Sequence, residues 1–378
     1  MIIDIHTHAF PGKIAAAALQ KLSRNSHTLP FTDGTEAALQ RSMARAGIDL
    51  SVILPVATAP RQVMHINDSA AGICENSRET GLFSLGCMHP DFDGYKEELA
   101  RLAGLGIPGI KIHPVYQETD MDDIRFLRIF DRIAELGMFV LAHAGYDIGF
   151  PGVERCSPPI SLRVIRRIPQ LKLVLAHMGG WQNWDTASEL LADTQVLLDM
   201  SFATGRLTPL PGDDHWTKKP VSQLTPLQFL SMVRRFGADR ILFGSDCPWA
   251  DQKTVLADLL ALPLTAEEKE AILMDAVDRA VAAFPKDAVI LPFLKEHRAE
   301  VKEMLLTEYN EAEAMRLFFL DGERVGEKRG IEKGRNHTIY EMVQDGDISV
   351  ARAAQKLKIS EKQVRDNMLL LGFRMPKE

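Results

Sequence analysis

Four histidines and one aspartate have the residue types and the spacing to bind a divalent metal. His6 and His8 lie two residues apart, His143 and His177 each follow a Val-Leu-Ala run, and Asp246 follows Phe-Gly-Ser. Residues two apart in a strand face the same side, so His6 and His8 would present two imidazoles together. Joined by a further histidine and a carboxylate, they give three or four N and O ligands. Such a set suits Zn²⁺ or another divalent cation with one position left for water.

Each of these side chains ends a short apolar run or follows it directly, and eight such runs precede residue 284. The runs are Ile2–His6, Ser51–Ala57, Leu82–Met88, Gly109–His113, Met138–His143, Leu171–His177, Val196–Ser201 and Arg240–Asp246. Most are continuously apolar, as parallel strands buried on both faces should be. Between the runs, the pattern predicts helices over Thr35–Ala46, Asp122–Leu136 and Pro226–Phe236. In the second of these, Ile124, Phe130 and Ile133 share one stripe at helical spacing.

Eight alternating strand and helix units predict an α/β fold, a (β/α)₈ TIM barrel. An open doubly wound sheet also alternates strands and helices, but no glycine-rich dinucleotide loop follows the first run. In a barrel, the C-terminal ends of the strands converge on one mouth, where active sites are built. The five residues would therefore meet there, which packing alone does not explain.

A bound divalent metal would make hydrolytic chemistry available at this mouth. It lowers the pKa of a bound water to about 7 in favourable sites and polarises a substrate carbonyl. A neighbouring carboxylate or imidazole can then take the proton from that water. Asp246 and His177 are the candidates for this catalytic role, and our hypothesis is that Asp246 shuttles the proton.

Taken together, the motifs Asp-Ile-His6-Thr-His8, Leu-Ala-His143-Ala-Gly, Leu-Ala-His177-Met-Gly-Gly and Phe-Gly-Ser-Asp246 resemble those of the amidohydrolase superfamily. The resemblance covers about residues 1–284. It is greatest to the branch that contains metal-dependent hydrolases and aminocarboxymuconate-semialdehyde decarboxylase. It implies a barrel with one metal ion per chain, held by His6, His8, His143 and Asp246. It also implies that His177 is an acid or base beside the metal-bound water, or a ligand to a second metal.

Lys111 lies in the fourth run, in Gly-Ile-Lys-Ile-His-Pro, and allows two interpretations. Some superfamily relatives carry a carbamylated lysine on this strand that bridges two metals. The interpretation favoured here is that Lys111 pairs with a carboxylate or binds substrate, because an uncarbamylated ammonium offers a metal no acceptor atom. His113 shares its face and is predicted to line the pocket.

Substrate-binding candidates lie in the segments that follow the runs. Tyr146 and Arg155 follow the fifth run, Trp181 the sixth and Trp249 the eighth. The guanidinium fork of Arg155 matches a substrate carboxylate. The tryptophans would give an aromatic wall for a planar ligand, or simply pack the loops against the barrel.

From about residue 285 onward no apolar strand-like run recurs, so the sequence predicts two parts, 1–284 and a helical tail, 285–378. Four glycines spaced four residues apart, from Gly322 to Gly334, indicate a weak helix or a connector. Ser349 and Ser360 are plausible N-caps of short helices with helix–turn–helix spacing. The segments 275–281 and 293–311, with the glycine repeat, resemble the C-terminal helical region of transposase-related recombination-promoting nucleases. No nuclease core accompanies them, and a helical appendage or oligomerisation element is favoured over DNA binding.

Composition narrows the class of protein. The chain has 378 residues, a formal net charge of −7 and four cysteines. The negative charge argues against a mainly nucleic-acid-binding protein. No apolar run approaches the length of a membrane span, and the N-terminus lacks the basic start of a secretory signal. Cysteines without a paired motif fit a reducing compartment, so we expect a cytoplasmic enzyme, most simply a homo-oligomer.

The sequence thus predicts a metal-dependent hydrolase in which activated water attacks a C–N or C–O acyl bond of a small molecule. The alternative is a metal-dependent decarboxylase of a small aromatic or unsaturated acid, which needs the same metal but delivers a proton to carbon. A DNA-associated regulator with a degenerate barrel is a third possibility, and the complete ligand set argues against it.

Overall fold

The computed structural model describes residues 2–205, 207–275, 338–357, 360–370 and 373. The chain divides into two compact units, Met1–Ala314 and Met315–Glu378, and each is described by itself. This division and the predicted one near residue 285 both fall between residues 276 and 337, outside the described residues. The glycine repeat and the segment 293–311 lie there too, as does 275–281 beyond its first residue.

Parallel strands at the centre of the first unit follow the eight apolar runs of the sequence. They are β1 (Ile3–Thr7), β2 (Leu50–Ile53), β3 (Leu82–Ser84), β4 (Gly86–Cys87), β5 (Gly109–Ile112), β6 (Phe139–Ala142), β7 (Lys172–Leu175), β8 (Leu197–Asp199) and β9 (Ile241–Leu242). One sheet has the order β1-β2-β3 and the other runs from β4 to β9 in sequence order. β3 and β4 are the two pieces of the predicted Leu82–Met88 strand, and between them Leu85 N donates to Ile53 O at 3.1 Å.

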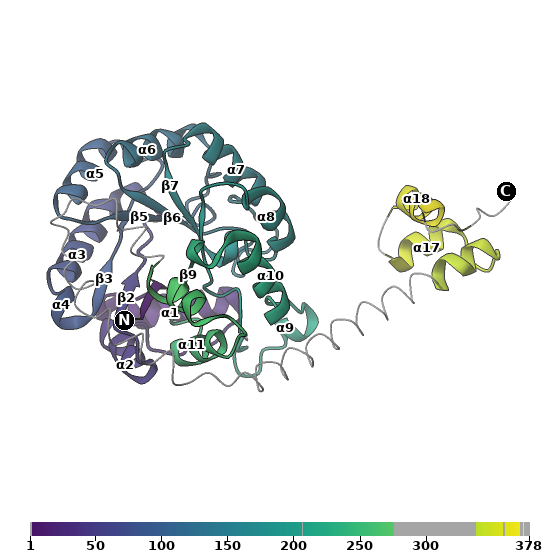
Figure 1. The fold of residues 1–378 in the computed structure, drawn as a ribbon, viewed down its shortest axis with the longest axis horizontal. Helices are drawn as coiled ribbons and strands as arrows, with labels where there is room; N and C mark the ends of the chain where they lie inside the picture. Colours follow the sequence, from purple (N-terminus) through teal and green to yellow (C-terminus); the bar gives the residue numbers. More distant parts are fainter. Residues whose placement is uncertain (1, 206, 276–337, 358–359, 371–372, 374–378) are drawn as a thin grey trace. The chain divides into compact units, whose positions relative to one another are not determined.

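Backbone hydrogen bonds close the ring between the last strand and the first. Ile5 N donates to Phe243 O at 2.9 Å, and Asp246 N donates to His6 O at 2.8 Å. Thr7 and Cys247 form a parallel bridge just beyond them. The predicted (β/α)₈ barrel is therefore confirmed, with its helices around the outside of the strands (Figure 1).

The helices connect the strands in the order that the sequence predicts. They are α1 (Gly12–Ser26), α2 (Glu36–Ala46), α3 (Val63–Glu75), α4 (Ser77–Thr80), α5 (Tyr95–Gly104), α6 (Ile124–Glu135), α7 (Pro158–Arg167), α8 (Trp184–Leu191), α9 (His215–Lys218), α10 (Pro226–Phe236), α11 (Gln252–Leu260) and α12 (Ala266–Glu270). Side-chain caps fix where several of them begin. Thr35 accepts from Ala38 N at the start of α2, and Thr225 forms a capping box with Gln228 at the start of α10.

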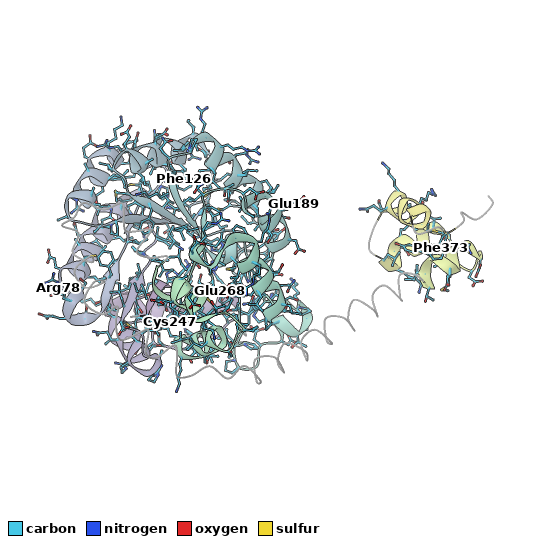
Figure 2. All side chains as sticks on the ribbon, in the orientation of Figure 1. Arg78, Phe126, Glu189, Cys247, Glu268 and Phe373 are labelled. Atoms are coloured by element: carbon cyan, nitrogen blue, oxygen red, sulfur yellow. The ribbon has the colours of Figure 1, made fainter. Side chains whose placement is uncertain are left out.

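Helix α6 lies within the predicted range Asp122–Leu136 but is shorter at both ends, and the stripe predicted for it is partly wrong. Ile124 is 69% exposed, whereas Phe126, Ile129, Phe130 and Ile133 are fully buried. Asp123 caps this helix, accepting from Arg125 N at 2.9 Å, so Ile124 occupies its first position. The apolar face therefore begins two residues later than predicted, and Phe126, labelled in Figure 2, is its first buried residue.

Gly145 brings two site-forming segments into close contact. Its φ is +83°, and a Cβ at this position would lie 2.2 Å from Trp181 N. Trp181 N donates to Ala144 O at 2.9 Å, and Tyr146 N donates to Trp181 O at 3.1 Å. Any larger residue would push the segment after β6 away from the segment after β7.

The second unit is helical where it is described. Residues 338–344 are helical, and α17 (Val350–Leu357) and α18 (Glu361–Leu370) follow. Ser349 accepts from Arg352 N at 3.2 Å, and Ser360 forms its capping box with Gln363, as the sequence predicts. The buried residues of this unit form a small core of Ile339, Tyr340, Val343, Ala353, Ala354, Val364 and Met368. Across both units, none of the described helices has the length and apolarity that a membrane span requires.

Candidate metal centre

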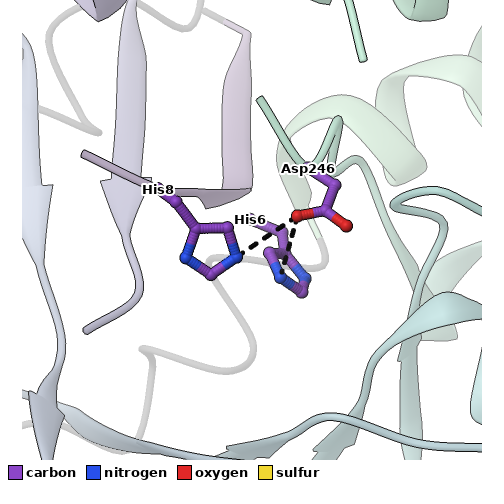
Figure 3. A group of neighbouring side chains, drawn as sticks. All are labelled: His6, His8 and Asp246. Carbon is purple, nitrogen blue, oxygen red and sulfur yellow. Dashed lines mark ion pairs between the residues drawn. The ribbon is translucent and has the colours of Figure 1, made fainter. Parts of the chain in front are cut away.

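The three groups at the heart of the site come from the two strands that close the barrel. His6 lies in β1, His8 directly follows it, and Asp246 follows β9. Asp246 Oδ1 is 3.2 Å from His8 Nε2 and 3.7 Å from His6 Nε2 (Figure 3). One ligand atom from each residue lies within 4.8 Å of the others. Two nitrogens and a carboxylate oxygen therefore face one another, as the sequence predicts.

The other ring nitrogen of each histidine has an acceptor that fixes the position of its proton. His6 Nδ1 donates to Asp199 Oδ2 at 2.9 Å, and His8 Nδ1 donates to the Leu54 carbonyl oxygen at 2.9 Å. Burial, followed by the charge of Lys111, holds the pKa of His6 well below its usual value, so its ring is neutral. The protons on Nδ1 leave both Nε2 lone pairs directed at Asp246.

These atoms fit a cation. Asp246 Oδ1 is buried and has no hydrogen-bond partner among the described residues, and no proton stands between it and the two Nε2 lone pairs. Buried polar atoms are rarely left unpaired, because losing water costs them several kcal/mol when nothing replaces it. A divalent metal satisfies all three atoms at once, and the N₂O set suits Zn²⁺ or a related ion.

Asp246 is held in position by a buried network behind it. Its φ is +66°, a conformation that L-residues adopt rarely, and its backbone N–H bonds to His6 O. The neighbouring Ser245 donates its N–H and its hydroxyl to Asp4, at 2.9 and 2.5 Å, and Gln252 Nε2 donates to Asp4 at 2.8 Å. Burial raises the pKa of Asp246, and positive charge on His6 and His8 would lower it. Because these rings present lone pairs instead, a bound cation would keep the carboxylate ionised.

His177 and His143 form a pair beside this group. His177 Nδ1 donates to Ser201 O at 2.8 Å, which leaves its Nε2 lone pair facing His143 Nδ1 at 3.0 Å. His143 therefore lies outside the tight group of His6, His8 and Asp246, although it was predicted as a ligand to the same ion. Its own Nε2 is buried without a hydrogen-bond partner in the described part of the chain.

A second group of ligand-type residues comprises His113, His143 and Asp147. His113 Nε2 lies 3.3 Å from Asp147 Oδ2, and His143 Nε2 lies 3.9 Å from the same oxygen. However, His113 Nδ1 accepts the Tyr116 N–H at 3.4 Å, so the proton of His113 is on Nε2 and points at Asp147. The rings of Tyr116, His113 and His143 are stacked, with centroids 3.8 and 4.1 Å apart. In this second group, a proton therefore already lies between His113 Nε2 and the Asp147 carboxylate.

Lys111 is buried in the barrel, 1% exposed, with its Nζ 3.4 Å from His6 Nε2. Burial lowers the pKa of this amine to about 8. At neutral pH Lys111 is therefore still mostly protonated, although it loses its proton at a lower pH than an exposed lysine.

A cavity of about 240 Å³ opens over these groups. The predicted substrate-side residues Lys111, His113, Tyr146, Trp181 and Trp249 all line it. Arg155 does not; its guanidinium pairs with Asp120 at 2.9 Å instead. Aromatic side chains form much of the wall, namely Phe10, Tyr116, Tyr146, Trp181, Phe202 and Trp249.

Sequence reasoning missed three buried polar residues that contact the site. Asp199 and Ser201 lie behind His6 and His177, and Asp147 lies beside His143. Asp199 carried a signal, because it is an acidic residue inside the seventh apolar run. Asp147 follows the fifth run by a few residues, where the sequence pointed to Tyr146 and Arg155.

Comparisons with known protein families and solved structures cover the whole barrel. The family profile described as "Amidohydrolase" matches residues 3–276. No curated protein sequence matches the chain. Among solved structures, an uncharacterized TIM-barrel protein from Bordetella bronchiseptica is 19% identical with a TM-score of 0.55, over 75% of this chain and 98% of that one.

Two further solved structures are described as decarboxylases. The manganese-bound 5-carboxyvanillate decarboxylase LigW2 from Novosphingobium aromaticivorans is 16% identical with a TM-score of 0.53, over 74% of this chain and 96% of that one. The 2,6-dihydroxybenzoate decarboxylase from Rhizobium is 16% identical with a TM-score of 0.51, over 74% of this chain and 98% of that one. At these identities the likeness establishes the barrel fold.

Proposed function

This chain belongs to the amidohydrolase family, and on that premise we propose that it is a metal-dependent hydrolase that cleaves a C–N or C–O acyl bond of a small molecule. The observation that carries the proposal is the convergence of two imidazole lone pairs on Asp246 Oδ1, which has no hydrogen-bond partner in the part of the chain that the structure describes. His6, His8 and Asp246 would hold a divalent cation, with His143 as the predicted fourth ligand. Such a cation, when bound, acidifies water and polarises a carbonyl.

The protonation states around the cavity favour hydrolysis over decarboxylation. A bound cation would keep Asp246 ionised, so its carboxylate can accept a proton from the attacking water. Burial lowers the pKa values of His6 and His143 well below the usual range, so both rings are neutral. Decarboxylation requires a proton to be delivered to carbon, for which His177 is also the candidate donor, so the preference for hydrolysis rests on Asp246 as the acceptor. His177, next to this group, would return the proton to the leaving group.

The second candidate is a non-oxidative decarboxylase, and the aromatic wall of the cavity is the observation that favours it. Phe10, Trp181 and Trp249 are among six aromatic side chains that suit a planar ring. The two decarboxylases with the same barrel act, by their names, on aromatic acids of this shape. Lys111 is placed to meet a carboxylate in the same cavity.

A substrate panel separates the two candidates. Purified enzyme loaded with Zn²⁺ or Mn²⁺ is assayed against lactones, esters and amides by acid release, and against hydroxybenzoates and muconate-type acids by carbon dioxide release. Acid release that Asp246→Asn abolishes would support the hydrolase. Carbon dioxide release with no turnover of the acyl substrates would replace it with the decarboxylase. A wild-type protein that binds neither metal would overturn both.

A further inference from the structure

Asp199 occupies the last position of β8, in the interior of the barrel and behind the proposed metal ligands. It has no exposed surface, and every contact below is to a residue of the site. Asp199 Oδ2 accepts from His6 Nδ1 at 2.9 Å. Asp199 Oδ1 accepts the backbone N–H groups of Ser201, at 3.0 Å, and His177, at 3.3 Å, together with the Ser201 hydroxyl. Its two oxygens therefore serve two different imidazole-bearing segments.

Ser201 connects the same two imidazoles. Its Oγ lies 2.8 Å from His6 Nδ1 and 3.1 Å from His177 Nδ1, and its carbonyl oxygen accepts from His177 Nδ1 at 2.8 Å. His6 comes from β1 and His177 from the turn after β7, yet the nitrogens that face away from the cavity converge on this one residue. Both side chains are buried, so water cannot substitute for these contacts.

We propose that Asp199 and Ser201 are positioning residues that fix the tautomer and the orientation of His6 and His177. The inference rests on the proposed metal-dependent function, since it concerns residues that would act behind a ligand and behind an acid–base group. Asp199 holds the His6 proton on Nδ1, which keeps Nε2 available to a cation. The Ser201 carbonyl holds the His177 proton on Nδ1 in the same way. Because Asp199 keeps His6 Nε2 free, the affinity for metal would depend on a carboxylate that does not itself contact the metal.

The arrangement of donors makes Asp199→Asn an informative substitution. Three donors converge on Asp199 Oδ1, two of them rigid backbone N–H groups, so the amide oxygen of asparagine must occupy that position. The NH₂ group then faces His6 Nδ1, where wild type has an acceptor. Two donors cannot face each other, and Ser201 Oγ, 2.8 Å from His6 Nδ1, is a neutral acceptor that would replace the carboxylate only in part. We therefore expect His6 to move its proton to Nε2. That proton would point at Asp246 and at any cation bound there.

The experiment measures Zn²⁺ affinity and histidine tautomers in parallel on the metal-free protein. Zn²⁺ is titrated against a chromophoric chelator, and long-range ¹H–¹⁵N spectra report which nitrogen of His6 carries the proton. In Asp199→Asn we expect Zn²⁺ binding to weaken by about 10- to 100-fold and the His6 proton to lie on Nε2. In Ser201→Ala, which retains the carbonyl, we expect a loss of about fivefold or less.

Two controls separate positioning from general damage. Asp193→Asn makes the same charge change at a side chain that is 82% exposed, and should leave Zn²⁺ affinity unchanged. Leu198→Ala removes buried apolar contacts from the same strand, and should lower stability without moving the His6 proton.

Several outcomes would overturn the proposal. A folded Asp199→Asn protein that binds Zn²⁺ like wild type, or that keeps the proton on Nδ1, would do so. If this variant does not fold, the wild-type spectrum decides, because a His6 proton on Nε2 contradicts the proposal and one on Nδ1 supports it. A wild-type protein that binds no divalent cation would overturn the proposed function itself, which is a different result from equal binding by both proteins.

Discussion

The two sides of the cavity contain the same groups, two imidazoles and one carboxylate, but their protons lie in different places. On the side of β1 and β9, the protons of His6 and His8 point away from the cavity, toward Asp199 and the Leu54 carbonyl. On the side of β5 and β6, the His113 proton points at Asp147. The first side therefore presents two lone pairs to a carboxylate, whereas the second presents the N–H of His113 together with the lone pair of His143 Nε2.

This difference shows that composition alone does not define a metal site. Three ligand atoms lie within 4.8 Å of one another on both sides. What separates the sides is the atom behind each ring, because an acceptor there frees the inner nitrogen and a donor there occupies it. We therefore propose cation binding for the first side and hydrogen bonding for the second, and each prediction below tests that proposal.

Asp246→Asn should have the largest effect. It removes the charge that balances a divalent cation and the oxygen that accepts a proton, so we expect turnover to fall on the order of 10³-fold or more. Steady-state kinetics on the metal-loaded protein, with metal content measured on the same sample, would show it. Near-normal turnover would show that Asp246 takes no part in the chemistry and that the first side does not need its carboxylate.

Removal of the metal should lower stability through the first side alone. A ligand present at 100 times its Kd stabilises the folded state by about 2.7 kcal/mol, so chelation should lower the Tm of the barrel by roughly 5–10 °C. Differential scanning calorimetry with and without a chelator measures this shift. His8→Ala should abolish it, whereas His113→Phe on the second side should retain it. Loss of the shift in His113→Phe would place a cation on both sides.

The sequence alone could predict the barrel and most of the first side, for a physical reason. Strand ends converge in a barrel whatever the detailed packing, so His6, His8 and Asp246 could be placed together from their positions in apolar runs. Proton positions could not be predicted in this way, because they depend on contacts between distant segments. The Leu54 carbonyl behind His8 is one such contact, and the Asp199 carboxylate behind His6 is another.

Arg155 and Ile124 illustrate a second limit of prediction from sequence, which concerns the direction of single side chains. Both were predicted from residue type and spacing, but their side chains follow local backbone geometry. Arg155 O accepts from Met121 N at 2.9 Å, and its side chain pairs with Asp120 outside the cavity lining. Ile124 occupies the first position of α6 and faces solvent. One residue of difference at a segment boundary changes the direction of a side chain, and sequence patterns do not resolve boundaries that finely.

The network behind Asp246 should make stability depend on pH. Burial raises the pKa of Asp4 from 3.8 to about 6, so the native state holds more protons than the unfolded state between these values. The stability contributed by Asp4 therefore falls as pH rises from about 4 to about 6, by up to roughly 3 kcal/mol in total.

Urea unfolding of the metal-free protein measures this contribution, as the stability of wild type minus that of Asp4→Asn at each pH. The asparagine variant cannot ionise, so the difference should decrease with rising pH across this window. If the stability difference between wild type and Asp4→Asn is the same at every pH, Asp4 keeps one protonation state across this window. The network behind Asp246 would then not titrate as described here.

Asp147→Asn should have the smallest effect, because the second side does not depend on a cation. Gly149 N donates to Asp147 Oδ1 at 2.7 Å, and an amide oxygen can accept that bond equally well. The new NH₂ group would then face His113 Nε2, which already carries a proton, so the cavity wall must adjust locally. We expect kcat/KM to fall about tenfold, as for the loss of one hydrogen bond of about 1.4 kcal/mol, with unchanged metal content. Kinetics combined with metal analysis test both parts. A tenfold loss with full metal content would keep the two sides distinct, whereas loss of metal would show that Asp147 binds a cation and that the two sides are alike.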